Sequence, residues 1–166
     1  PDAWELRRNE RTQTRQGNRN PFIDYPGFAA SIWGNVTPPT IIQFNPASVT
    51  TNEAAGTVNL SVQIINPSAT AATTVQVSLS SGTASDIGNF TTRTVTFPAG
   101  TTANQNVSIN LTDDALLEGT ESLIFTLINP LGGFNPAIGP YANCTLYIED
   151  NDIPAPVALE PTELTF

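Results

Sequence analysis

Apolar and polar residues alternate with a period of two through the middle of the chain, and this limits the segment to β-structure. In Thr57–Ile65, Val58, Leu60 and Val62 fall on one face of an extended chain, and polar residues fall on the other. One buried and one wetted face are typical of antiparallel sheets, whereas parallel α/β strands are apolar on both faces. Similar patterns predict seven strands in about 110 residues, with Gly, Pro and Asn at the turns. The expected fold is therefore an all-β, antiparallel Greek-key sandwich of immunoglobulin-like shape.

These strands are expected at the following positions: a kinked first strand over Ile41–Phe44 and Ser48–Thr51, then Thr57–Ile65, Thr74–Leu79, Arg93–Phe97, Asn106–Thr112, Glu121–Ile128 and Ala142–Ile148.

The distribution of charge divides the 166 residues into unequal parts. Residues 1–35 hold five of the six arginines and have a net charge of +1, whereas residues 36–166 hold only Arg93 and have a net charge of −10. A shift this abrupt predicts a boundary, and consecutive prolines predict a linker over residues 36–39. We expect the sandwich over residues 40–153. Residues 154–166 are expected to contain a second linker and the start of a following domain.

Missing residue types limit the chemistry. The chain contains no His and a single Cys, which excludes Ser-His and Cys-His catalysis, His metal sites, an intramolecular disulfide and cysteine-rich zinc sites. We therefore expect that this chain is not an enzyme. Cys144 is in phase with Leu146 and Ile148, which predicts an inert core position. The sequence pI of about 4.1 argues against nucleic acid as a partner of the whole chain.

Acidic residues collect in alternate loops of the predicted sandwich. If consecutive strands run antiparallel, the first, third and fifth loops and the segment after the last strand lie at one end. Nine of the eleven acidic residues that follow residue 35 belong there, while the loops expected at the other end carry no charge. Like charges gathered in this way repel one another unless a cation neutralises them. These nine residues are Glu53, Asp86, Asp113, Asp114, Glu118, Glu121, Glu149, Asp150 and Asp152.

A hard divalent cation is the partner that this pattern favours. Ca²⁺ takes about six to eight oxygen ligands from flexible loops, whereas Mg²⁺ demands stricter octahedral geometry. Transition metals favour imidazole or thiolate ligands. The alternative is that Asp and Asn simply form turns and keep the loops soluble, but such residues should then occur at both ends. The acidic loops therefore predict a Ca²⁺ site, with solubilising turns as the alternative.

Several motifs in this segment resemble those of Calx-beta domains. Asp113–Glu121, with the sequence DDALLEGTE, resembles the Asp-Asp-x-x-x-Glu-x-x-Glu stretch of that family. Three further segments, Gly82–Thr91, Val95–Gly100 and Ile148–Asp152, are similar to the family in order and spacing, so the resemblance covers about residues 38–153. It implies a seven-stranded sandwich that binds calcium. The implied ligands are Glu53, Asp113, Asp114, the Leu116 carbonyl, Glu118, Asp150, the Asn151 carbonyl and Asp152, with Glu121 shared or just behind them.

The chain departs from the family pattern at one position. The family usually has Asp before an aromatic residue in the third loop, whereas this chain has Asn89 before Phe90. Asn keeps an oxygen but loses a charge, and we expect the nearby Asp86 to compensate as a further ligand.

The first 35 residues carry a separate pattern. Residues 3–15 predict a polar, arginine-rich helix, followed by an irregular loop over residues 16–24 and a short apolar turn at Phe28, Ile32 and Trp33. The simplest interpretation is a packing extension with a solvated basic face. The segments WE, RNE and QGNRNPFID resemble the C-terminal end of bacterial secreted endonuclease I-type nucleases over about residues 2–33. That resemblance implies that residues 1–35 are a nuclease remnant whose catalytic histidine lies upstream.

Together these patterns predict a non-catalytic calcium-binding spacer in a secreted, extracellular, multidomain bacterial nuclease. The expected partners are a calcium ion, an upstream nuclease domain and a downstream domain of the same polypeptide. No membrane partner is expected, and nucleic acid is expected only through the parent nuclease. The alternative is an accessory adhesion or substrate-binding module for nucleic acid or glycan. A glycan site usually needs aromatic platforms, and the predicted sandwich contains no Trp.

Overall fold

A computed structural model describes residues 2–25, 32, 34 and 37–154 of the chain. The chain separates into two units, Pro1–Pro38 and Pro39–Phe166, close to the position where its charge changes sign. Of the predicted apolar turn, Ile32 is exposed, whereas Phe28 and Trp33 lie outside the described residues. Most of the segment predicted to contain a second linker and a following domain also lies outside them. Neither helix of the described part is long and apolar enough to cross a bilayer.

The first unit contains two helices, α1 (Ala3–Gln16) and α2 (Pro21–Asp24). α1 begins at a capping box, in which the Asp2 carboxylate accepts the N–H groups of Trp4 and Glu5 while the Glu5 carboxylate accepts the N–H of Asp2. It ends at Gly17, whose φ of 76° is a conformation that Gly adopts freely. The predicted helix is confirmed.

The segment after α1 is more ordered than predicted. In place of an irregular loop over residues 16–24, the chain forms the single turn α2. The Asn20 side chain accepts the N–H of Phe22, and Pro21 occupies the first turn, where its missing N–H costs nothing.

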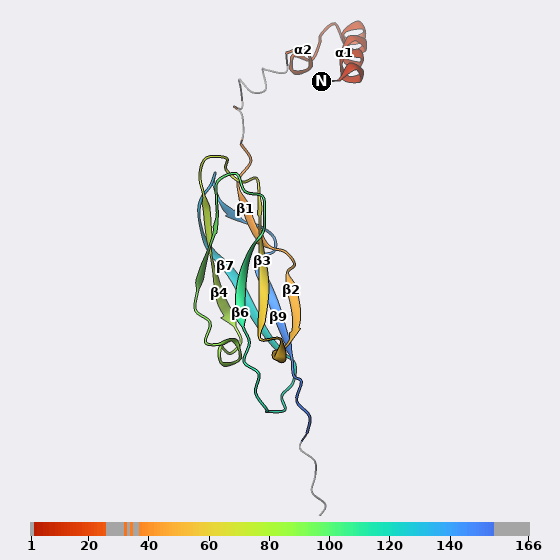
Figure 1. The fold of residues 1–166 in the computed structure, drawn as a ribbon. Helices are drawn as coiled ribbons and strands as arrows, with labels where there is room; N and C mark the ends of the chain where they lie inside the picture. Colours follow the sequence, from red (N-terminus) through yellow and green to blue (C-terminus); the bar gives the residue numbers. More distant parts are fainter. Residues whose placement is uncertain (1, 26–31, 33, 35–36, 155–166) are drawn as a thin grey trace, which may run out of the picture. The chain divides into compact units, whose positions relative to one another are not determined.

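The second unit is a sandwich of a four-stranded and a five-stranded sheet (Figure 1). The first sheet has the order β6-β3-β1-β8 and the second the order β2-β9-β7-β4-β5. The elements are β1 (Ile41–Phe44), β2 (Ser48–Asn52), η1 (Glu53–Ala55), β3 (Thr57–Ile65), β4 (Thr73–Ser81), η2 (Ser85–Ile87), β5 (Arg93–Phe97), β6 (Gln105–Asn110), β7 (Glu121–Gly132), β8 (Ala137–Ile138) and β9 (Asn143–Glu149).

The all-β sandwich is confirmed, but the described part contains nine strands where seven were predicted. The predicted kinked first strand is two strands, β1 and β2, which lie in different sheets. Pro46 lies between them and cannot donate to a strand ladder, so the pairing of β1 ends before it. The two-residue strand β8 is too short to leave a pattern. The sheets are also not wholly antiparallel, because β1 pairs with β8 and β2 with β9 in parallel. The Greek-key connection stays a prediction.

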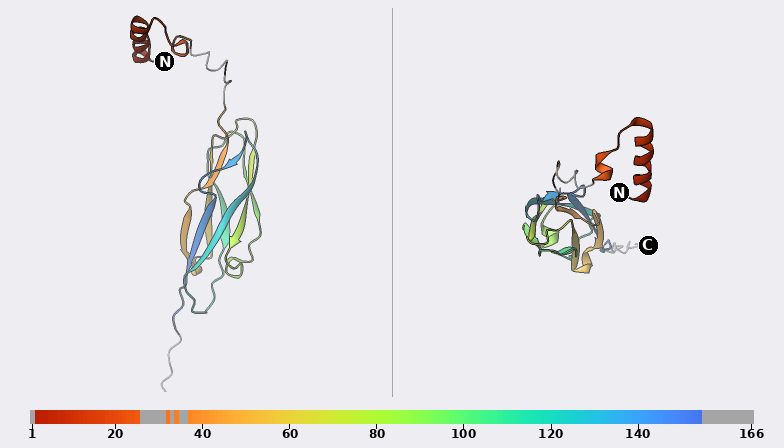
Figure 2. Two further views of the ribbon diagram at one scale, coloured as in Figure 1. Left: turned by 180° about the vertical axis from the view of Figure 1, so that it is seen from behind. Right: turned by 90° about the horizontal axis from the view of Figure 1, so that it is seen from above.

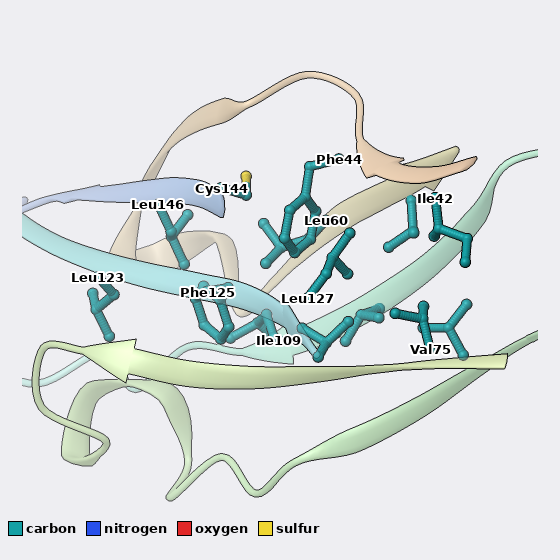
Figure 3. Packing of buried hydrophobic residues seen from close by; sticks show 14 of the residues in the cluster. Ile42, Phe44, Leu60, Val75, Ile109, Leu123, Phe125, Leu127, Cys144 and Leu146 are labelled. Carbon is teal, nitrogen blue, oxygen red and sulfur yellow. The ribbon is translucent and has the colours of Figure 1, made fainter. Parts of the chain in front are cut away.

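The core lies between the two sheets, which face each other in the view along the sandwich (Figure 2). Alternate residues point inward, as the period of two predicts. Figure 3 shows Phe44 and Leu60 of the first sheet and Phe125 and Leu146 of the second in the space between the sheets, and all four side chains are fully buried. Cys144 is also buried, and burial raises the pKa of its thiol to about 11, which confirms an inert core position.

Four connections emerge at the same end of the sandwich: η1 after β2, η2 between β4 and β5, the loop between β6 and β7, and the segment after β9 (Figure 1). We call this the acidic end, because it carries Glu53, Asp86, Asp113, Asp114, Glu118, Glu121, Glu149, Asp150 and Asp152.

Candidate metal centre

The parallel pairing of β2 and β9 positions the central carboxylates. The last matched residues of this pair are Asn52 and Glu149, so Glu53 and Asp150 leave adjacent strands at the same level. The Asn52 side chain then accepts the N–H of Ala54 at 2.9 Å and caps η1. This cap turns the chain at Glu53, whose side chain is only 6% exposed. A buried carboxylate is therefore built into the base of the acidic end.

Glu53, Asp150 and Asp152 form a compact cluster. Each offers a carboxylate oxygen, and these oxygens all lie within 4.8 Å of one another. The cluster holds itself together through backbone groups: Asp150 accepts the N–H of Asp152 at 2.7 Å, and Glu53 accepts the N–H of Asn151 at 3.5 Å. Asp152 Oδ2 is buried and has no hydrogen-bond partner in the described part of the chain. A buried acceptor without a partner is costly, which favours a missing ligand at this oxygen.

The electrostatics of the cluster are unfavourable without a cation. Burial raises the pKa of Glu53, and the charges of Asp150, Asp152 and Asp113 raise it further, against the lowering effect of the Asn151 N–H. Burial, followed by the charge of Asp150, likewise raises the pKa of Asp152. No arginine of the described residues forms an ion pair with any of these carboxylates. A group of mutually repelling carboxylates, with oxygen as its only kind of ligand atom, fits a hard divalent cation.

The loop between β6 and β7 reaches this cluster. The N–H of Glu118 donates to Asp150 Oδ2 at 2.6 Å, and the Asn151 amide donates to Asp113 Oδ1 at 3.4 Å. Asp114 accepts the N–H of Leu116 at 2.8 Å, which shapes the loop. Burial raises the pKa of the Glu118 carboxyl, and the charge of Asp114 is the next contribution. The loop thus adds three carboxylates beside the cluster: Asp113, Asp114 and Glu118.

Asp86 and Glu121 form a second acidic pair next to Glu118. Asp86 lies in η2, where its backbone carbonyl accepts the N–H of Thr112 at 2.9 Å, and Glu121 is the first residue of β7. Burial raises the pKa of Glu121, and the charges of Asp86 and Glu118 raise it further. The pair is electrostatically coupled to the cluster without belonging to its compact group of three.

Asn89, which stands where the resemblance implies Asp, closes a turn with a left-handed backbone. Its φ of 53° lies in the left-handed region, which Asn and Asp both adopt more readily than most residues. Its N–H donates to the Ala84 carbonyl at 2.8 Å and closes the turn around η2.

Sequence reasoning gathered these residues at one end but missed three details. It gave no sign that Glu53 is the buried member, because a 3₁₀ turn after a polar strand has no apolar pattern. It did not anticipate the amide contacts of Asn151. It also counted Glu149 with the rest, although that side chain is exposed and lies outside the compact group. Coordination by the carbonyls of Leu116 and Asn151 stays a prediction.

Comparison with known proteins agrees with this architecture. The family model of the Calx-beta domain matches residues 36–152. The structure of the apo-form Calx CBD1 domain is 25% identical, with a TM-score of 0.62, and the match covers 69% of this chain and 100% of that chain. The structure of the calcium binding domain CBD12 of CALX1.1 is 27% identical, with a TM-score of 0.58, and the match covers 67% of this chain and 46% of that chain.

A more distant structure, the Calx CBD2 domain, is 11% identical with a TM-score of 0.55, and the match covers 67% of this chain and 86% of that chain. At this identity the likeness shows the fold alone. No curated protein matches the chain. The family model does not include residues 1–35, so the nuclease resemblance of that segment stays a prediction.

Proposed function

Since this chain belongs to the Calx-beta domain family, we propose that its sandwich binds Ca²⁺ through the carboxylates of the acidic end. The cluster of Glu53, Asp150 and Asp152 carries the proposal. Ligand oxygens lie about 2.3–2.6 Å from Ca²⁺, so two oxygens on one ion are at most about 5 Å apart. The three carboxylate oxygens lie within 4.8 Å of one another, which is compatible with a single shared ion.

The donor set also fits calcium chemically. Glu53, Asp150 and Asp152 would hold the ion, with the orphaned Asp152 Oδ2 gaining the partner that it lacks. Asp113, Asp114 and Glu118 would complete the shell from the loop between β6 and β7, together with the carbonyls of Leu116 and Asn151. Asp86 and Glu121 adjoin this group. Asp86 would be a further ligand, and Glu121 would be shared or lie just behind the ligands. The bound ion would neutralise the repulsion that raises the pKa values of Glu53 and Asp152.

The role that we propose is structural, as a non-catalytic calcium-stiffened spacer. The ion would join the loop between β6 and β7 to the exits of β2 and β9, which are separate in the sequence. A ligand that binds only the folded state at a hundredfold excess over its Kd stabilises that state by about 2.7 kcal/mol. The chain contains no His, which supports a role outside catalysis.

The wider setting that we propose is a secreted, extracellular bacterial nuclease, of which residues 1–35 are the last part of the enzyme domain. The support is the resemblance of the segment QGNRNPFID to endonuclease I-type nucleases. Extracellular fluids contain enough calcium to fill even a weak site. We expect that this chain alone does not cleave DNA with any divalent ion. Cleavage that persists through repurification would contradict this expectation.

Thermal unfolding with calcium or with EDTA tests the calcium site. We expect calcium to raise the melting temperature and EDTA to lower it, and Asp152→Asn to remove most of the difference. Glu149→Gln is the matched control, because it removes the same charge from a neighbouring exposed position and should keep the calcium response. Melting curves that coincide with and without EDTA would refute the proposal.

A further inference from the structure

The helix α1 carries arginines along one of its sides. With about 3.6 residues per turn, four exposed arginines of α1 fall within an arc of about 100° around the helix axis. Trp4 falls in the middle of the same arc, and its side chain is 62% exposed. Both glutamates of the helix, Glu5 and Glu10, fall outside the arc. We call the following residues the arginine stripe: Trp4, Arg7, Arg8, Arg11 and Arg15.

The arginine stripe faces away from the side of α1 that packs within its own unit. Asn9 and Gln13 lie on the packed side. The Asn9 amide donates to Asp24 at 3.0 Å, and the Gln13 side chain accepts a hydrogen bond from Arg19 at 3.2 Å. Of the arginines that the structure describes, Arg19 alone forms an ion pair, and its partner is Asp24. The arginines of the stripe therefore have no carboxylate partner in the described part of the chain.

The side chains of the stripe enclose an open hollow of about 600 Å³. It is lined by Arg8, Arg11, Thr12, Thr14, Arg15 and Gln16. All six side chains carry hydrogen-bond donors, and none is acidic. The guanidinium group of arginine presents paired donors that match the oxygens of a phosphate group. The composition of this hollow therefore suits phosphate.

We propose that the arginine stripe binds single-stranded nucleic acid, with its arginines on successive phosphates and an unpaired base stacked on Trp4. The stripe extends about 16 Å from Trp4 to Arg15, at about 1.5 Å per residue. This is several times the spacing of phosphates along one strand of DNA, which is about 3.4 Å, so the stripe fits a polymer. Exposed aromatic rings beside a basic track are the arrangement by which proteins hold single strands. The proposal is independent of the calcium site and requires no nuclease activity.

A single strand fits the stripe better than an anionic membrane does. Basic helices that lie on a membrane bury a broad apolar face in the lipid. The apolar residues of α1 are only Ala3, Trp4 and Leu6, and Leu6 falls on the opposite side of the helix from Trp4. A duplex would satisfy the arginines, but its paired bases are stacked on one another and cannot stack on Trp4.

The acidic pI of the chain does not oppose this proposal. The net charge of −10 belongs to residues 36–166, whereas residues 1–35 have a net charge of +1. The two parts fall in separate units. The proposal therefore revises the expectation that nucleic acid is a partner only through a parent nuclease.

Fluorescence anisotropy of a labelled strand of about twenty thymidines, titrated with the full chain in EDTA, tests the proposal. EDTA removes calcium, so the result does not depend on the calcium site. If all four arginines contact phosphates, the logarithm of the binding constant should fall with the logarithm of salt concentration with a slope of about −2.8. The variant with both Arg8→Gln and Arg11→Gln should halve this slope. It should also bind about sixtyfold more weakly in about 50 mM salt, where each phosphate contact contributes roughly eightfold.

Trp4 separates binding to a single strand from binding to any phosphate polymer. Trp4→Ala should bind the thymidine strand about tenfold more weakly, with the salt slope unchanged. Trp4→Phe keeps a stacking ring and should restore most of the affinity. Trp4→Ala should not weaken binding to a duplex. A strand of uridines should bind as the thymidine strand does, because phosphates and base faces are common to RNA and DNA.

The matched control for charge is Arg93→Gln, which removes an arginine from the sandwich and should leave binding unchanged. Circular dichroism checks that α1 persists in each variant, as expected for substitutions of exposed side chains. No binding by the unaltered chain, or equal binding by the double arginine variant, would overturn the proposal. An equal effect of Trp4→Ala on single strand and duplex, or a large preference for RNA or DNA, would also overturn it. Binding to phosphatidylserine vesicles but not to nucleic acid would assign the stripe to membranes and overturn it as well.

Discussion

Asp24 and Asp152 are both partly buried, yet their carboxylates have opposite surroundings in the two units. In the helical unit, Asp24 forms an ion pair with Arg19 and accepts a hydrogen bond from the Asn9 amide at 3.0 Å. The hydrogen bond from Arg19 is the main reason that the pKa of Asp24 is lowered. In the sandwich, burial and neighbouring charges raise the pKa of Asp152, and one of its oxygens has no partner in the described part.

The two regions differ in how completely the protein satisfies its own polar groups. Asn9 is 2% exposed, and it links α1 to the turn before α2 by accepting the N–H of Asn20 at 2.7 Å and donating to its carbonyl at 3.2 Å. Every polar group of this small network is satisfied by protein. At the acidic end, N–H groups reach Glu53, Asp114 and Asp150, but Asp152 Oδ2 has no partner in the described part of the chain. A carboxylate that the protein satisfies indicates a structural role, and one that it leaves unsatisfied indicates a ligand.

The largest expected effect follows from removing the buried carboxylate of the acidic end. We expect Glu53→Gln to abolish most of the rise in melting temperature that calcium produces, which is on the order of 10 °C at a hundredfold excess over Kd. Without calcium, this variant should be at least as stable as the unaltered chain, because it loses a repelling charge. Thermal unfolding in matched buffers measures both effects. A variant that keeps the full calcium response would show that Glu53 is not a ligand.

The next effect concerns the satisfied network. Asn9→Ala leaves the Asn20 N–H without its acceptor and removes a donor to Asp24, so we expect the helical unit to lose about 1–3 kcal/mol of local stability. Amide hydrogen exchange at Asn20 and the helical signal in circular dichroism measure this loss. The calcium response of the sandwich should not change, because Asn9 belongs to the other unit, and a changed response would contradict this expectation.

A smaller effect is a difference between the two regions in how their stability depends on pH. The raised pKa values of Glu53, Glu118, Glu121 and Asp152 mean that their folded-state repulsion disappears as they gain protons. With EDTA, the melting temperature of the sandwich should therefore rise as the pH falls from neutral through these raised values toward 4.5, the ordinary Glu value. With calcium, protons compete with the ion, so the trend should reverse.

The helical unit should respond to pH with the opposite sign. Since the pKa of Asp24 lies below its ordinary value of 3.8, its stabilising contribution is present above that value and is lost as the pH falls through the lowered pKa. Circular dichroism of the helices and melting of the sandwich, followed over one pH series, measure the two trends. Parallel trends in EDTA would contradict the contrast between the regions.

The smallest effect is expected from an acidic residue outside the cluster. Glu149→Gln should change the melting temperature by no more than about 2 °C, with or without calcium. Its side chain is exposed and belongs neither to the metal cluster nor to the network around Asn9. A large loss of calcium response in this variant would mean that net charge, and not the geometry of the cluster, controls binding.

The sequence was sufficient for the features that rest on local periodicity. Alternation in Thr57–Ile65 correctly predicted a strand with a buried face, and the phase of Cys144 correctly predicted its core position. Periodicity says nothing about which strand pairs with which. The division of β1 from β2, their parallel partners and the two-residue strand β8 depend on contacts between distant segments, so the predicted strand count was wrong.

The candidate site shows the same limit. Counting charges loop by loop was enough to place the acidic residues at one end, because that inference needs only the alternation of strand direction. The same count could not tell which of these residues are buried or lack a hydrogen-bond partner. The burial of Glu53 and the orphaned oxygen of Asp152 arise where η1 meets the exit of β9. The network of Asn9 was missed for a similar reason, since a buried Asn on a polar helix is indistinguishable in sequence from an exposed one.

The parallel pairing of β2 with β9 also has a mechanical consequence. The two strands end side by side at Asn52 and Glu149, and the chain then leaves β9 through Asp150 and Asp152. Tension applied from the C-terminal side would reach these carboxylates before it reached the ladder of the sheet. An ion bound to these carboxylates and to Glu53 would resist this tension before the strands separate. The force needed to start unfolding the sandwich by pulling would therefore depend on calcium.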